Sequence, residues 1–262
     1  MEILIPVLVL GSLGLIFGIS LAFASQRLAV KSDPRLERIQ TLLPGANCGA
    51  CGSAGCLGFA ERLLGGQVGL DACRVTEEKA KAEIAKILGK KIERKSKTVA
   101  FLHCNGGRRV KDRFIYYGIE DCVAVNLILA GQKECGWGCL GFGTCVEVCP
   151  FGAISMGKEV LPVVDFEKCK GCGKCVQVCP KKLFTLIPIT SNVYVACSSH
   201  DLGKDTREVC TVGCVGCKRC QEVCPVDAII VIDNLATIDY NKCNNCGECV
   251  RVCPTKAILI RR

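Results

Sequence analysis

The sequence predicts an α+β protein in which an apolar N-terminal helix precedes a small α-helical domain and two similar cysteine-rich units. Three observations lead to this prediction. The chain opens on a long uncharged segment, 24 of its 262 residues are cysteine, and short strand-like runs recur before dense groups of cysteines. Because only 5% of the residues are aromatic, we expect several small cores. This composition excludes collagen, a coiled coil and a disordered chain.

Residues 3–24 form the first element and carry no charge. At ~1.5 Å per residue they are long enough for a helix that crosses a bilayer. An acidic residue, Glu2, precedes them, and the basic residues Arg27, Lys31, Arg35 and Arg38 follow. A secretory signal has the opposite order, with its positive charge before the apolar stretch. The triplet Ala22-Phe23-Ala24 resembles a signal-peptide cleavage site, so a signal peptide stays open as an alternative. The basic flank predicts that the rest of the chain is cytoplasmic, where disulfides are disfavoured.

The remaining chain divides into three parts. After a transmembrane segment at 1–25, residues 26–95 predict a small helical domain, with Thr76 as a helix N-cap and Gly89 as a helix end. Residues 96–190 and 191–262 predict two homologous units. Each begins with a strand, 98–102 or 192–196, that leads to a cysteine, Cys104 or Cys197. An isolated cysteine, Cys122 or Cys210, and two dense cysteine runs follow in each unit.

Three of the dense runs have the CxxCxxCxxxCP spacing of bacterial ferredoxins, in which three cysteines bind one [4Fe-4S] cluster and the fourth binds its neighbour. Zinc sites instead use separated pairs of cysteines. The spacing therefore predicts two ferredoxin-like 2[4Fe-4S] units. The predicted ligand sets are Cys169, Cys172 and Cys175 with Cys149; Cys214, Cys217 and Cys220 with Cys253; and Cys243, Cys246 and Cys249 with Cys224.

The remaining run, Cys135, Cys139, Cys145 and Cys149-Pro150, has wider gaps but keeps the Cys-Pro end. The same crossing predicts that Cys135, Cys139 and Cys145 share a cluster with Cys179.

A separate group in the helical domain has the spacing CxxCx4Cx16C. Its members, with glycine and alanine between the first two, are Cys48, Cys51, Cys56 and Cys73. Four such ligands suit a fifth [4Fe-4S] cluster, and the spacing alone leaves zinc open.

Four cysteines remain: Cys104, Cys122, Cys197 and Cys210. If the two strands lie side by side, these thiols could converge on a sixth iron–sulfur or other metal centre. The alternatives are buried structural thiols, a disulfide or zinc.

The formal charge of +9 suggests a nucleic-acid or lipid partner until the clusters are counted. Five clusters of about −2 each leave a net charge of about −1, so no nucleic-acid partner is expected. The sequence has no phosphate-binding loop, catalytic triad or paired-carboxylate site. We therefore expect no catalytic residue and no bond chemistry from this chain alone.

The order of these parts resembles the B subunits of Rnf complexes, the ion-translocating ferredoxin:NAD⁺ oxidoreductases of bacterial membranes. The resemblance rests on Asn47-Cys48-Gly49-Ala50-Cys51, on the widened run from Cys135 and on the regular runs after it. It implies an electron-transfer subunit on the cytoplasmic side of the inner membrane. Soluble ferredoxin would be the donor, other membrane and flavin-bearing subunits the partners, and Na⁺ or H⁺ the coupled ion. The segment Cys48–Cys73 also resembles a domain of corrinoid iron–sulfur proteins, which favours iron–sulfur over zinc there.

Two other functions remain open from the residues themselves. One is a membrane-tethered reductase that supplies electrons to another metalloenzyme, and the other is a zinc scaffold without redox activity. For an acidic ferredoxin, Arg108, Arg109, Lys111 and Arg113 form a candidate docking surface, with a solvated loop as the alternative.

Overall fold

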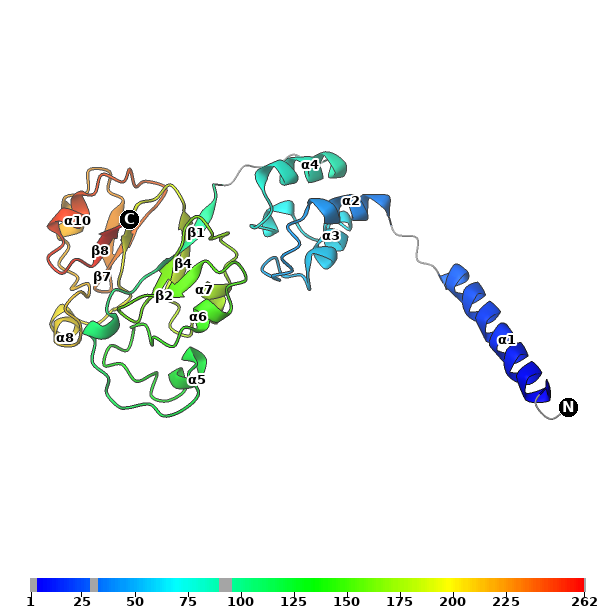
Figure 1. The fold of residues 1–262 in the computed structure, drawn as a ribbon. Helices are drawn as coiled ribbons and strands as arrows, with labels where there is room; N and C mark the ends of the chain where they lie inside the picture. The colour runs from blue at the N-terminus through cyan, green and yellow to red at the C-terminus, as the bar shows by residue number, and fades with distance from the viewer. Residues whose placement is uncertain (1–3, 29–32, 90–95, 262) are drawn as a thin grey trace.

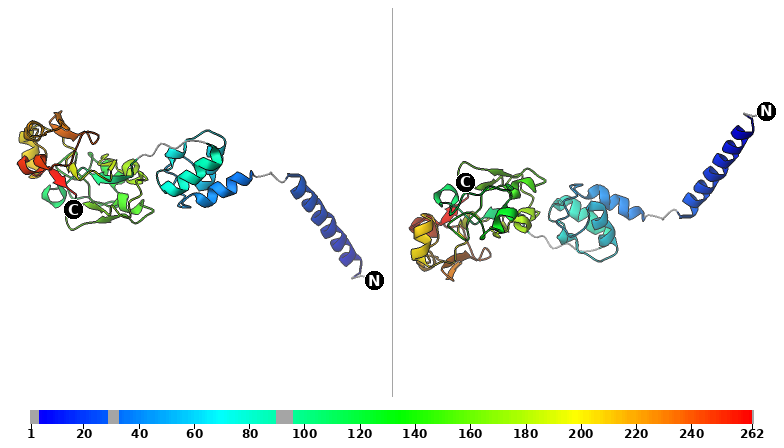
Figure 2. Two further views of the ribbon diagram at one scale, coloured as in Figure 1. Left: turned by 90° about the horizontal axis from the view of Figure 1, so that it is seen from above. Right: turned by 90° about the horizontal axis from the view of Figure 1, so that it is seen from below.

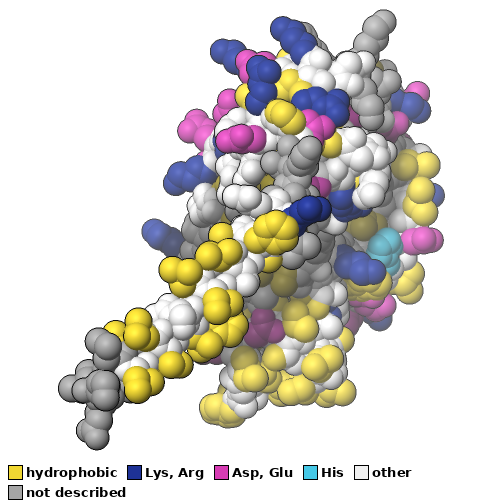
Figure 3. All heavy atoms as spheres, turned by 90° about the vertical axis from the view of Figure 1, so that its right-hand side faces the viewer, with side chains coloured by type: hydrophobic (Ala, Val, Ile, Leu, Met, Phe, Trp, Pro, Cys, Tyr) yellow, Lys and Arg dark blue, Asp and Glu magenta, His cyan; other side chains and the backbone are white. Residues whose placement is uncertain are grey.

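The computed structural model describes residues 4–28, 33–89 and 96–261. Its first helix, α1 (Leu4–Leu28), lies apart from the rest of the chain (Figure 1). The segment Val7–Arg27 has a mean hydropathy of 2.4, and none of its most apolar stretch is buried. Hydrophobic side chains stand out along the helix in Figure 3. In the part of the chain that the structure describes, this is the one helix long and apolar enough to cross a bilayer, which confirms the predicted apolar helix.

The predicted small domain is helical. It contains α2 (Pro34–Leu42), α3 (Cys56–Leu64), the 3₁₀ turn η1 (Leu70–Ala72) and α4 (Glu78–Leu88). Ile39, Phe59 and Ile84, all fully buried, form its core. The helix α4 ends at Gly89, whose φ of +64° is the left-handed conformation that glycine adopts without strain. It begins later than predicted, after Glu77 and not after Thr76.

The first cysteine-rich unit is built on two antiparallel strand pairs. In chain order it contains β1 (Thr98–Leu102), η2 (Gly107–Arg109), α5 (Cys122–Asn126), α6 (Thr144–Glu147), β2 (Ile154–Met156), β3 (Pro162–Val164), α7 (Lys174–Val178) and β4 (Phe184–Pro188). β1 pairs with β4, so that Thr98 opposes Pro188 and Leu102 opposes Phe184, and β2 pairs with β3 as a hairpin. The first strand of the unit thus pairs with its last strand, and the cysteine runs lie between these two strands in the sequence.

The second unit repeats this topology. It contains β5 (Val193–Val195), α8 (Gly203–Val209), α9 (Arg219–Glu222), β6 (Ile229–Ile232), β7 (Leu235–Ile238), α10 (Glu248–Val252) and β8 (Ile258–Ile260). β5 pairs with β8, and β6 pairs with β7 as a hairpin. The mixed helix and strand content and the internal repeat confirm the predicted α+β fold class.

The two units pack directly against each other. The Phe101 ring of β1 lies 4.9 Å from Tyr194 of β5 and 4.9 Å from Phe166, centroid to centroid. His103 Nδ1 lies 2.6 Å from the Val195 carbonyl oxygen, and its Nε2 lies 2.6 Å from Thr185 Oγ1. Because both ring nitrogens are used within the chain, His103 holds the two units together and is not free to bind a metal. Figure 2 shows the units side by side with the helical domain next to them.

One segment of the first unit exposes apolar side chains. Between Arg113 and Gly131 the chain forms a long loop around α5, and the Arg113 guanidinium closes it through bonds to the Leu129 and Gly131 carbonyls. Tyr117 is 90% and Leu127 is 82% exposed. Hydrophobic side chains gather at the lower end of the molecule in Figure 3, where α5 lies in Figure 1. These side chains therefore contribute little to the core.

Candidate functional site

The second unit shows how a regular cysteine run is arranged. One cavity is lined by four cysteines, Cys214, Cys217, Cys220 and Cys253. The first three surround the start of α9, and the fourth comes from the end of α10. This is the crossed set that the ferredoxin spacing predicts. In the same unit, the Cys249 thiol interacts with those of Cys243, Cys246 and Cys224, the members of the second crossed set.

The cysteines that precede proline share a local geometry. The sulfur of each accepts a hydrogen bond from the backbone N–H four residues later, because proline turns the chain back over the thiol. The donors and distances are Ala153 to Cys149 at 3.3 Å, Leu183 to Cys179 at 3.4 Å, Ala228 to Cys224 at 3.3 Å and Ala257 to Cys253 at 3.3 Å. Such bonds stabilise a thiolate and tune the potential of a cluster that it binds.

The crowded thiols are costly to ionise in the chain by itself. Burial, together with the neighbouring thiols, raises the pKa of Cys175 to about 12 and that of Cys249 to about 11. A cationic iron core reverses this, because metals bind the deprotonated thiolate. The donor set therefore fits a bound cationic group.

The spacing of the sulfurs favours a cluster over a single ion. Four thiolates on one zinc ion lie about 3.8 Å apart, given Zn–S bonds of ~2.3 Å. Among the described residues, which include all the cysteines, no three His, Cys, Asp or Glu side chains approach closely enough to hold one metal ion. A cube of four irons holds its thiolates further apart than one ion does.

The regular run of the first unit, Cys169 to Cys179, adjoins the helical domain. The Cys172 thiol interacts with those of Cys149 and Cys169, as predicted, and also with Cys48 of the helical domain. The Cys169 sulfur accepts a bond from the Ala100 N–H of β1 at 3.5 Å. The set of Cys169, Cys172, Cys175 and Cys149 thus lies against the set that contains Cys48.

In the helical domain, Cys48, Cys51, Cys56 and Cys73 all pack in one core. Asn47, with φ +45°, turns its side-chain oxygen to the Cys56 N–H at 2.8 Å and so closes the loop at the start of α3. The Thr76 hydroxyl donates to the Cys73 sulfur at 3.0 Å. Thr76 therefore serves the thiol and does not cap α4, which corrects the sequence prediction.

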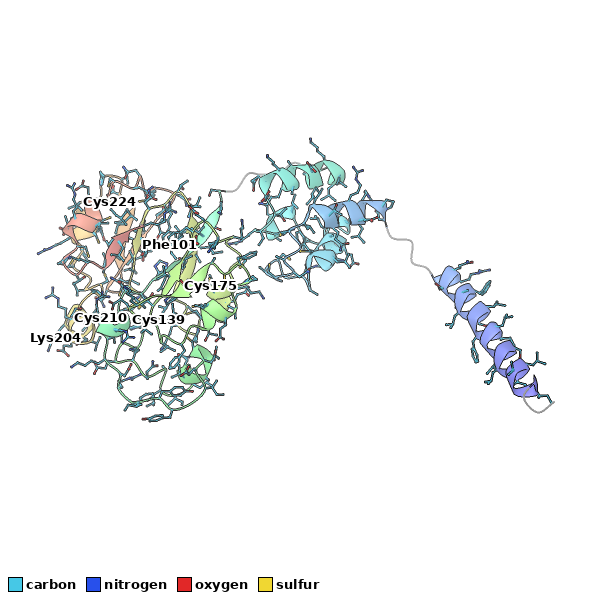
Figure 4. The ribbon with its side chains drawn as sticks, viewed as in Figure 1. Phe101, Cys139, Cys175, Lys204, Cys210 and Cys224 are labelled. Carbon is cyan, nitrogen blue, oxygen red and sulfur yellow. The ribbon has the colours of Figure 1, made fainter. Side chains whose placement is uncertain are left out.

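The first unit departs from the predicted grouping. One cavity is lined by Cys139, Cys145 and Cys179, as predicted, together with Cys122. Cys135 instead lines a second cavity with Cys104, Cys197 and Cys210. Cys139 borders both cavities; it lies beside Cys210 in Figure 4. Cys122 is fixed at the start of α5, where its N–H donates to Thr144 Oγ1 at 2.8 Å and Asp121 caps the helix.

Four cysteines lie outside the five predicted cluster sets. The structure brings three of them together and places the fourth elsewhere. Cys104, Cys197 and Cys210 line one cavity, whereas Cys122 lines the other. The cavity that holds these three cysteines is also lined by Cys135 and Cys139, and not by Cys122 as predicted.

The candidate docking arginines are engaged within the chain. Arg108 Nε donates to the Lys158 carbonyl at 3.1 Å, Arg109 donates to the Asn105 carbonyl at 2.9 Å, and Arg113 closes the loop around α5. These three arginines therefore have structural roles within the chain, which favours the alternative to a docking surface.

Comparisons with known proteins match iron–sulfur families to the cysteine-rich segments. A family described as an Fe-S cluster matches residues 43–75, the 4Fe-4S dicluster domain matches 134–183 and 168–228, and the 4Fe-4S binding domain matches 236–259.

Three curated relatives span nearly the whole chain. The B subunit of the Na⁺-translocating ferredoxin:NAD⁺ oxidoreductase complex of Acetobacterium woodii is 46% identical over 92% of this chain and 73% of its own length. The B subunit of the proton-translocating complex of Clostridium ljungdahlii is 45% identical over 92% of this chain and 86% of its own. The B subunit of the ion-translocating oxidoreductase complex of Methanosarcina acetivorans is 41% identical over 90% and 89%.

Proposed function

Because the chain belongs to the family of B subunits of ion-translocating ferredoxin:NAD⁺ oxidoreductase complexes, we propose that it is the iron–sulfur electron-transfer subunit of such a complex. It passes electrons from reduced ferredoxin towards NAD⁺, and the complex couples this transfer to the movement of Na⁺ or H⁺. The relatives are named for either ion at nearly equal identity.

The observation that carries this proposal is the repeated crossed set of cysteines around a small cavity, with backbone N–H groups directed at the sulfurs. Bound [4Fe-4S] clusters supply one-electron acceptance and release at low potential. The chain's own residues hold the thiolates and donate hydrogen bonds to them.

Four ligand sets follow from the spacing and are supported by the contacts between thiols. They are Cys48, Cys51, Cys56 and Cys73; Cys169, Cys172, Cys175 and Cys149; Cys214, Cys217, Cys220 and Cys253; and Cys243, Cys246, Cys249 and Cys224. A fifth set contains Cys139, Cys145 and Cys179.

The partners are the other subunits of the complex, and soluble ferredoxin is the donor. The chain is associated with the membrane through α1, which we place as a single span of the cytoplasmic membrane. Arg27 at the end of α1 and the basic residues after it favour a cytoplasmic position for the cysteine-rich units.

Purification of the full chain without oxygen tests this function. We expect at least about 20 iron atoms and as many sulfides per chain, from five clusters of four irons. Reduced ferredoxin should bleach the visible absorbance and produce the EPR signals of reduced [4Fe-4S] clusters. A protein without inorganic sulfide, or one whose clusters dithionite reduces and ferredoxin does not, would refute the proposal.

A further inference from the structure

Two neighbouring cavities in the first unit and at its contact with the second are lined by eight cysteines between them. The cavity near α5 has Cys122, Cys139, Cys145 and Cys179, and the cavity between the units has Cys104, Cys135, Cys139, Cys197 and Cys210. Only Cys139 borders both. If each cavity has four ligands, Cys139 must belong to the first, because the first would otherwise have three.

The sulfurs of the second cavity converge from both units. A Cβ added at Gly106 would lie 3.5 Å from Cys210 Sγ and 3.8 Å from Cys104 Sγ, so both sulfurs lie close to the same point beside Gly106. The Cys135 thiol interacts with both Cys104 and Cys210, and the Cys197 thiol interacts with Cys104. All four therefore face one space, two from each unit.

Two of these sulfurs also accept backbone hydrogen bonds, as the cysteines before proline do. Cys104 Sγ accepts from the Cys139 N–H at 3.4 Å, and Cys197 Sγ accepts from the Cys214 N–H at 3.2 Å and from the Ser199 N–H at 3.4 Å. A thiol that serves only as a small buried hydrophobe needs no such donors. The two bonds from Cys139 and Cys214 are equivalent in the two units.

The internal repeat explains the arrangement when the runs are aligned without a gap. The segment from Cys135 to Pro150 and the segment from Cys210 to Pro225 have the same length. In this register Cys135 matches Cys210, and Phe142 stands where the second unit has the ligand Cys217. The remaining matches are Cys139 with Cys214, Cys145 with Cys220 and Cys149 with Cys224. The run from Cys139 is therefore a regular ferredoxin run that lacks one cysteine.

We propose that Cys104, Cys135, Cys197 and Cys210 bind a sixth [4Fe-4S] cluster between the two units, and that Cys122 replaces the ligand missing at Phe142. This inference rests on the proposed function. It accounts for all 24 cysteines as six sets of four. Because Cys104 matches Cys197 and Cys135 matches Cys210, each unit contributes the same pair of positions to the shared site.

The sixth set joins ligand sets that are otherwise separate. Cys48 of the helical domain adjoins Cys172, and Cys145 of the next set adjoins Cys175. Cys139 then donates its N–H to Cys104, and Cys214 of the second unit donates to Cys197. The sets thus form one continuous series from the helical domain, through the first unit and the shared site, to the second unit.

The alternatives for these thiols fit less well. All cysteines are free in the structure, so no disulfide closes the site. A single zinc ion would need thiolates closer together than any three metal-binding side chains of the described residues lie.

Iron content of single and double variants of the full chain, purified without oxygen, tests the assignment. We expect about 24 iron atoms in the unchanged protein. Cys135→Ala and Cys210→Ala should each lose about four, and the double variant should lose no more than either, because both remove the same cluster. The two single variants should lose the same component of the EPR spectrum. Leu202→Ala, at a side chain 63% exposed, is the control and should keep all its iron.

A rescue tests the exchanged ligand. Cys122→Ala should lose about four irons, and adding Phe142→Cys should restore them, because the new thiol occupies the ligand position of the regular run. The same Phe142→Cys change should not restore iron to Cys135→Ala.

Two results would overturn the inference. One is a Cys210→Ala variant with full iron content and an unchanged spectrum, and the other is an unchanged protein with about 20 irons. The second measurement needs no variant and is independent of any folding defect. Either result leaves the proposed function standing, whereas loss of all iron and sulfide from the unchanged protein would refute both.

Discussion

Replacing Gly171 by alanine tests whether the cysteine loops depend on close approach to the strands. Gly171 lies between Cys169 and Cys172 with φ +63°, and an added Cβ would overlap the Thr98 carbonyl oxygen of β1. Gly152, in the loop after Cys149, has φ +56° but nothing within 4 Å of an added Cβ. The two positions therefore share the backbone strain and differ in the overlap.

The expected cost follows from these two terms. A left-handed conformation costs an alanine ~1–2 kcal/mol, which applies to both variants. Overlap with a backbone atom that cannot rotate away adds ~1–3 kcal/mol at Gly171. Because 1 kcal/mol lowers the melting temperature of a chain of 150–250 residues by ~2–4 °C, Gly171→Ala should melt roughly 2–12 °C below Gly152→Ala.

The assay is the temperature at which the iron–sulfur absorbance of anaerobic protein disappears, compared at one heating rate. Gly171→Ala should also retain less iron after purification, because the overlap pushes the loop from β1, where the Ala100 N–H donates to Cys169. Equal melting temperatures and equal iron contents for the two variants would show that the close approach to Thr98 contributes nothing.

Three other substitutions or deletions probe the core, the helical domain and the anchor. Phe101→Ala should destabilise the protein by ~3–5 kcal/mol, because Phe101 is 2% exposed and contacts rings from both units, whereas Tyr117→Ala, at 90% exposure, should change the melting temperature little. Asn47→Ala should release iron faster from the set that contains Cys56, by removing the acceptor of the Cys56 N–H and costing ~1 kcal/mol; an iron-release rate equal to that of the unchanged protein would contradict this. A chain that begins at residue 29 should move from the membrane fraction to the soluble fraction with its iron content unchanged, because the most apolar stretch of α1 is unburied; membrane retention would point to a second attachment site.

Local patterns predicted much of the fold correctly. The uncharged N-terminal segment is a helix, the short apolar run 98–102 forms β1, and Gly89 ends α4. Each of these features is decided by residues close together in the chain, by their hydrophobicity or by their backbone preference. The spacing also predicted which thiols of the regular runs lie together in the second unit, because proline fixes the direction of the fourth cysteine there.

The grouping around Cys135 could not be obtained in the same way. It depends on which cavity a thiol faces, and that is set by the packing of β1 against β5 and by the position of α5, neither of which is local in sequence. A run counted from Cys135 is irregular, because the regular run begins at Cys139 and has Phe142 in place of its second cysteine. The equal lengths of the two segments, 135–150 and 210–225, are the signal in the sequence that reveals it.

The pairing of β1 with β4 bears on how the protein is made. A ribosome that has just produced Leu102 must add roughly 80 more residues before Phe184 can pair with it, which takes about 4–16 s at 5–20 residues per second. During that interval β1 has a free edge, and the thiols of the nascent chain are exposed to oxidants and stray metals. Iron is therefore best delivered to the first unit once its last strand, β4, has been made. The last cysteine of the helical domain precedes α4, so that domain can receive iron while translation continues.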